Sequence, residues 1–157
     1  MTERQIIEIL AAFTGSLGFA IVFHVRKDRV FFAGIGGFLS WAVYHLMGIW
    51  FVSDVPRFFV SSVVVTVYAE ILARVLKCPA TLFLVIGTIP LIPGGGLYRT
   101  MRFFMLEDYA ACSRQGLTTV FLAVAIAVGM LLPSSLFHVI RKFRWRKLTV
   151  LQALKRK

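Results

Sequence analysis

Long apolar runs separated by short charged turns are the feature of this sequence that most constrains its fold. The runs cover residues 6–25, 30–52, 58–76, 80–93 and 116–140. A helix of about 20 apolar residues is long enough to cross the hydrocarbon core of a bilayer. The runs are continuous and lack the alternation of a transmembrane β-strand, which favours helices over a barrel. The sequence therefore predicts an all-α integral membrane protein, one domain over residues 1–157 with about five transmembrane helices.

Charged residues are scarce, and they lie at the ends of the apolar runs. Of the 157 residues, 59% are hydrophobic and 16% are charged, with a formal net charge of +11. Soluble domains carry about 25% charged residues. The Lys and Arg residues gather in turns such as residues 26–29 and in the tail 141–157, and no broad basic face is expected. We therefore expect the chain to lie in a lipid bilayer and not to bind nucleic acid.

The distribution of Lys and Arg also predicts the orientation. With the N-terminus outside, alternating segments place most of the 18 Lys and Arg residues on the inner side, including those of the basic tail. Cytoplasmic loops carry the excess of positive charge in multi-pass proteins. The predicted topology has the N-terminus outside and the C-terminus in the cytoplasm. Cys78 and Cys112 then fall on opposite sides, so no disulfide is expected.

The fourth apolar run is interrupted by two prolines and three consecutive glycines. These residues are Pro90, Pro93, Gly94, Gly95 and Gly96. They cannot continue a regular helix. Backbone freed at membrane depth must be buried in protein or line a water-filled cavity. Since secondary transporters bind solutes at broken helices, a Pro/Gly-broken fourth helix predicts part of a transport path.

The residues after the glycines are expected to begin a second half-helix with a basic side. Tyr98, Arg99 and Arg102 belong to this segment, and the two arginines lie three residues apart. A helix N-terminus favours an anion such as a carboxylate. We assign all three residues to the predicted substrate path. The alternative is an ordinary outside loop followed by an interfacial helix whose arginines extend toward water.

Two ionisable residues inside the apolar runs are candidates for proton coupling. Glu70 lies within the third run, where a charged residue indicates function by default. Arg74 follows four residues later, so an ordinary ion pair is the alternative. His45 could titrate near neutral pH, although a histidine on such a face is more often simply hydrogen-bonded within the bundle. Glu8, near the outer end of the first run, is a similar case.

Small residues recur at helical spacing on three of the runs, as in helices that approach closely in lipid. The expected faces are Ala11, Gly15, Gly18 and Val22; Gly34, Gly37, Trp41, His45 and Gly48; and Ala123 with Ala127 or Ala125 with Gly129. These faces either pack within the bundle or dock a partner subunit.

Motifs of enzymes and metal sites do not occur in the sequence. It has no CxxC or His/Cys cluster, no nucleophile elbow, no phosphate loop and no dinucleotide fingerprint. We therefore expect no enzymatic activity, no metal and no cofactor. A channel ranks below a transporter, because no polar stripe follows the length of a run.

The segment 78–101, CPATLFLVIGTIPLIPGGGLYRTM, resembles the threonine/serine exporter family. It is most similar to the short, separately encoded subunit of the two-component members. Residues 18–24, GFAIVFH, resemble the first span of that family, and the likeness extends from residue 17 to about residue 133. The family-like positions are Pro79, Pro90, Pro93, Gly94 and Tyr98.

The resemblance implies a function that composition does not show. Members of the family export small amino acids, chiefly threonine and serine, using the proton gradient across the bacterial plasma membrane. Some two-component members are linked to export of dicarboxylates such as succinate. A larger membrane subunit is implied as the partner. The alternatives are a dicarboxylate exporter subunit and a non-transporting scaffold for the larger partner.

Overall fold

The computed structural model of the chain describes residues 3–155, with side chains described as far as Ile140 and at Lys142. Its elements are all helical: α1 (Glu3–Val22), α2 (Lys27–Met47), α3 (Asp54–Val75), α4 (Ala80–Thr88), the 3-10 turn η1 (Ile89–Leu91), α5 (Gly94–Met105) and α6 (Tyr109–Lys155). Most side chains of the basic tail lie outside the described residues.

Four of these helices are long and apolar enough to cross a membrane. They are α1, α2, α3 and the part of α6 that ends at Ile140. The pair formed by Ala80–Leu91 and Gly94–Met105 passes the same test together, bent by 46° at Ile92 and Pro93. The expectation that the second half-helix begins after the glycines is wrong, because α5 begins at Gly94 and the glycines form its first turn. The predicted all-α membrane bundle with a broken fourth helix is confirmed.

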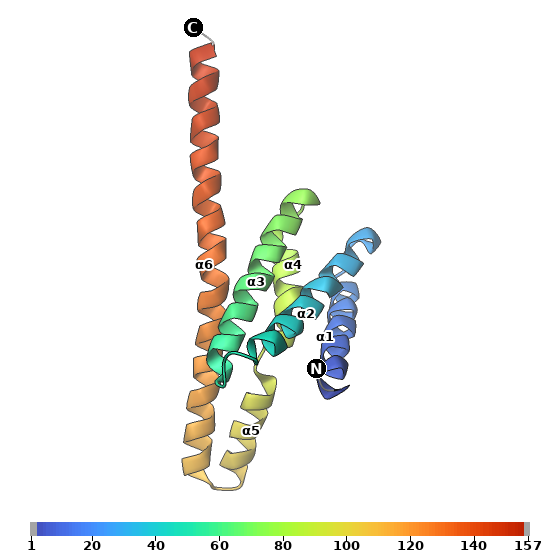
Figure 1. Cartoon of the computed structure of the whole chain (residues 1–157), viewed down its shortest axis with the longest axis vertical. Helices are drawn as coiled ribbons and strands as arrows, with labels where there is room; N and C mark the ends of the chain where they lie inside the picture. Colours follow the sequence, from blue (N-terminus) through green and yellow to red (C-terminus); the bar gives the residue numbers. More distant parts are fainter. Residues whose placement is uncertain (1–2, 156–157) are drawn as a thin grey trace.

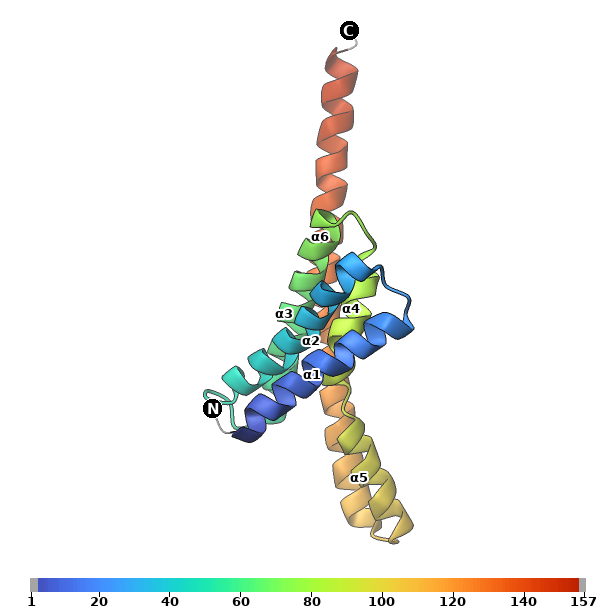
Figure 2. The same ribbon diagram turned by 90° about the vertical axis from the view of Figure 1, so that its right-hand side faces the viewer.

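Helix α2 lies at the centre of the bundle and packs against α1, α3 and α4. Helix α6 packs along α3 and, nearer its start, against α5 (Figures 1 and 2). The hairpin of α5 and the start of α6 extends beyond one end of α1 to α4 (Figure 1). We call this end, where α3 begins, the Asp54 end, and the opposite end, where α4 begins, the Pro79 end.

Two glycines of α2 allow α1 to approach closely. A Cβ added at Gly37 would collide with the Ser16 hydroxyl and would lie 2.8 Å from the carbonyl oxygen of Ala12. A Cβ at Gly34 would lie 2.6 Å from a methyl carbon of Leu17. Both glycines therefore belong to the helix interface that their spacing predicts.

The face of α1 that meets these glycines is not the expected one. Its buried residues are Ile9, Ala12, Ser16 and Ala20. The expected face is exposed, and within the described structure a Cβ at Gly15 or Gly18 would meet no atom within 4 Å. Small residues occur on both faces of α1, so spacing could not choose between them. In the folded bundle the Ser16 hydroxyl donates to the Ile86 carbonyl, 3.3 Å away.

The small residues of α6 also lie on two faces, one buried and one exposed. A Cβ at Gly129 would collide with the Ser62 hydroxyl of α3 and lie 2.8 Å from the Phe59 carbonyl oxygen. Ala125 is also buried, whereas Ala123 and Ala127 are exposed. The Ala125–Gly129 face therefore packs within the bundle.

Buried hydroxyl groups connect the central helices, a feature that the sequence analysis missed. Ser61 donates to the carbonyl of Ser40, which joins α3 to α2. Thr66 donates within α3 to the Ser62 carbonyl at 2.7 Å. These side chains are completely buried. Hydroxyls in membrane helices find carbonyl partners because lipid offers none, and the adjacent serines inside an apolar run were the available signal.

Candidate functional site

The first part of the break, η1, packs against α2, whereas Ile92 after it is exposed. The Trp41 Nε1–H group donates a hydrogen bond to the Pro90 carbonyl at 3.1 Å. Leu91 is fully buried and packs with Phe58 and Leu122. At the start of α5, Gly96 lies against Thr119 of α6. The protein therefore satisfies and covers backbone that the prolines free, as the membrane interior requires.

The residues predicted to contact an anion lie after the break in the chain, on α5. Gly94, Gly95, Tyr98, Arg99 and Arg102 are exposed on α5. This helix packs mainly against α6, in the hairpin beyond the Asp54 end (Figure 1). The structure does not bring them to Glu70, which lies near the Pro79 end. Their role in solute binding stays a prediction.

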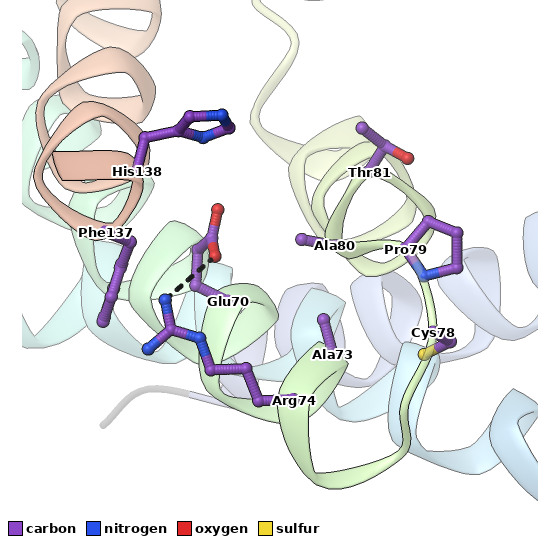
Figure 3. A pocket seen from close by; sticks show the side chains of 9 residues that line it. All are labelled: Glu70, Ala73, Arg74, Cys78, Pro79, Ala80, Thr81, Phe137 and His138. Carbon is purple, nitrogen blue, oxygen red and sulfur yellow. Dashed lines mark ion pairs between the residues drawn. The ribbon is translucent and has the colours of Figure 1, made fainter. Parts of the chain in front are cut away.

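A polar cavity of about 360 Å³ lies between the last turns of α3, the first turn of α4 and α6 (Figure 3). Its lining includes Glu70, Arg74, Cys78, Thr81, Phe137 and His138. The volume falls within the range of small-molecule sites. Helices that are distant in sequence thus meet around Glu70.

An ion pair occupies one wall of this cavity. The Arg74 Nη2 atom lies 3.7 Å from Glu70 Oε2. The Glu70 side chain is 19% exposed and that of Arg74 is 48% exposed. The guanidinium also lies over the Phe137 ring, 4.3 Å from its centroid. Figure 3 shows the two charged groups side by side at the cavity, so the pair is accessible to a solute.

The first turn of α4 forms the facing wall. Lys77 adopts the left-handed conformation, with φ of 49°, and the Cys78 N–H donates to the Ala73 carbonyl at 3.0 Å. This closure ends α3 and turns the chain into Pro79, which has no polar side chain to cap α4. The first N–H groups of a helix lack acceptors within the helix and attract anions. The cavity therefore combines a carboxylate, a guanidinium and an electropositive helix end.

His45, the other predicted proton carrier, lies at the Asp54 end. Its Nε2 atom is 3.1 Å from Oε2 of Glu8. The two candidates for proton coupling are thus placed at opposite ends of the bundle.

Sequence reasoning found Glu70 and His45 but missed the cavity. Arg74 was considered as an ion-pair partner, and His138 was not assigned to a site. The available signal was the Lys77-Cys78-Pro79 turn, which ends the third run shortly after Glu70 and Arg74 and precedes the start of the next helix.

Together these features define a multi-pass membrane protein with a polar cavity between its helices. Residues 8–136 match the model of the family described as Threonine/Serine exporter, ThrE, and the chain belongs to that family. This confirms the resemblance seen in residues 78–101 and makes the protein a member of a transporter family. Searches of curated proteins and of solved structures found no match.

Proposed function

We propose that this chain is a subunit of a proton-coupled exporter of small amino acids, most directly threonine and serine, and that the cavity beside Glu70 binds the solute. The observation that carries the proposal is the pairing of Glu70 with Arg74, 3.7 Å apart, beside the start of α4. This arrangement presents one negative and one positive group to the same small space.

An α-amino acid matches these charges. Its carboxylate would accept hydrogen bonds from Arg74 and from the first N–H groups of α4. Its ammonium group would donate to the Glu70 carboxylate. Hydrogen bonds with a charged donor or acceptor are shorter and stronger than neutral ones. Binding a zwitterion therefore replaces the internal Glu70–Arg74 pair with two pairs to the solute.

Competition at Glu70 would couple transport to protons. A protonated Glu70 carries no charge and loses its attraction for the ammonium group. Proton and amino acid then exclude each other, which gives antiport, and an inward proton gradient drives the solute outward. The predicted topology in the bacterial plasma membrane, with the N-terminus outside, places the Pro79 end and its cavity on the cytoplasmic side.

A dicarboxylate such as succinate is the second candidate solute, and it requires a different coupling. Ionised Glu70 would repel its second carboxylate, so binding would need Glu70 in its protonated form. Solute and proton would then bind together rather than compete. The cavity therefore favours the amino acid.

We further propose that a larger subunit docks on the exposed face of α1. Gly15 and Gly18 leave open space above their Cα atoms within the described structure. Close approach of a second helix is what such small residues permit in lipid. The segment from Pro93 to Arg102 would then line the outer part of the solute path at the Asp54 end, beyond the site that holds the bound solute. A scaffold without transport activity is the alternative.

Efflux measurements test this function. Cells that lack their own exporters are preloaded with labelled threonine or succinate, and they express this chain alone or with its larger subunit. We expect threonine efflux only with both chains, faster than succinate efflux and slowed when the external pH is raised. If neither solute moves in any combination while both proteins are in the membrane, the scaffold replaces the exporter.

A further inference from the structure

We propose that Glu8 and His45 form a proton-binding site at the Asp54 end that controls the contact between α2 and the break at Pro90. The inference rests on the proposed function only in taking this break to be part of the transport path. Neither of its tests measures transport.

The two side chains are close, and the histidine is shielded. Glu8 accepts a hydrogen bond from Arg4 Nε through Oε1, at 3.2 Å, and its Oε2 lies 3.1 Å from His45 Nε2. The His45 side chain is 11% exposed. Among the described residues, its Nε2 atom has no partner with hydrogen-bond geometry, so its contact with Glu8 is defined by distance alone.

Trp41 connects this pair to the break. It precedes His45 by four residues and shares its face of α2, and the two ring centroids are 5.4 Å apart. The indole N–H holds the Pro90 carbonyl at 3.1 Å. A groove of about 290 Å³ lined by Glu8, Trp41 and Pro90 runs along the same contacts. Two side chains, those of His45 and Trp41, therefore connect Glu8 to the break.

The surrounding charges leave Glu8 as the acid that faces His45. On α1, Arg4 binds the other oxygen of Glu8. On α2, the Tyr44 ring lies 5.4 Å from the His45 ring, and its hydroxyl donates to Asp54 of α3 at 2.9 Å. Asp54 is also paired with Arg57, at 3.4 Å. The turn η1 has the sequence Ile-Pro-Leu and contributes no titratable side chain.

Protonation of His45 strengthens two contacts at once. The imidazolium forms an ion pair with Glu8, and it lies within the distance at which a cation is attracted to an indole ring. Both attractions hold Trp41 in the position from which it binds Pro90. Loss of the proton weakens them, so the bend between α4 and α5 becomes free to change. Histidine ordinarily changes charge between pH 5 and 8, which is the range to examine.

Tryptophan fluorescence tests the proton site. In full-length protein carrying Trp50→Phe and Trp145→Phe, Trp41 is the remaining tryptophan. An imidazolium beside an indole quenches its emission, so fluorescence is expected to fall as the pH is lowered from 8 to 5. His45→Gln should abolish this change. A pH response that survives His45→Gln, or none in the parent, overturns the proposal.

Thiol labelling tests control of the break. Gly94→Cys, in a protein with Cys78→Ala and Cys112→Ser, adds a side chain where the described structure leaves open space. Its rate of reaction with a methanethiosulfonate is compared with that of the same protein carrying His45→Gln, at equal pH. We divide the rate of the protein that keeps His45 by the rate of the protein with His45→Gln. This ratio is expected to fall at low pH, where protonated His45 holds the break. Glu8→Gln provides the same comparison should His45→Gln not fold. A ratio that does not change with pH contradicts control of the break.

Discussion

Arg74→Gln is expected to lower amino-acid efflux by about 10- to 100-fold, because a hydrogen bond to a charged group contributes about 1.5–3 kcal/mol. The guanidinium is the cation of the cavity that lies beside both Glu70 and the start of α4. Glutamine keeps much of the side-chain length but is uncharged, so it cannot form an ion pair with the carboxylate of the solute. Efflux is measured at equal abundance of the protein in the membrane, with its larger subunit present.

Arg99→Gln and Arg102→Gln are the matched controls for this variant. Both arginines are exposed on α5, away from the cavity, and their replacement is expected to affect efflux less. Glu70→Gln should remove the dependence of efflux on the proton gradient, since glutamine does not titrate. If Arg99→Gln stops efflux and Arg74→Gln leaves it intact, the solute binds at α5, as the sequence alone predicts.

Gly37→Val is expected to destabilise the chain by about 1–3 kcal/mol or more, since overpacking a closely packed interface costs this much. Its Cβ would lie 2.8 Å from the carbonyl oxygen of Ala12, and backbone cannot rotate away as a side chain can. Helix α1 must therefore separate from α2. Thermal unfolding of the protein in detergent, followed by circular dichroism, measures the change.

Gly15→Val is the matched control on α1, because the described structure leaves open space at that position. Its stability should change by no more than about 0.5 kcal/mol, as for most exposed sites. Loss of copurification with the larger subunit, at unchanged stability, would support docking on this face. A destabilisation equal to that of Gly37→Val would show that α1 packs through its Gly15 face.

Local features of the sequence predicted the architecture well. Apolar runs define membrane helices because a bilayer imposes a minimum length, and Pro90 with Pro93 breaks a helix wherever the segment lies. The packed face of α1 was not predictable in this way. Both Ala11–Gly15–Gly18 and Ala12–Ser16–Ala20 present small residues at helical spacing, and the choice depends on α2 and α4.

The candidate site was predictable only in part. Glu70 stands out because it is ionisable within an apolar run. The cavity is formed by α3, α4 and α6. Helix α6 lies far from Glu70 in the sequence, so spacing could not connect Glu70 with Phe137. Arg99 seemed a suitable anion contact because it follows the glycines, yet the 46° bend directs α5 away from the bundle.

Protection of Cys78 by the solute is the most direct test of whether the cavity beside Glu70 binds that solute. Cys78 lines the cavity, and Cys112→Ser leaves it as the single thiol of this chain. Labelling by N-ethylmaleimide is followed with and without threonine, beside a comparison protein in which Cys78→Ala and Gly94→Cys place the thiol at the break. We predict that threonine slows labelling of Cys78 and leaves labelling at position 94 unchanged. Unchanged labelling of Cys78, with protection at position 94 instead, would contradict it.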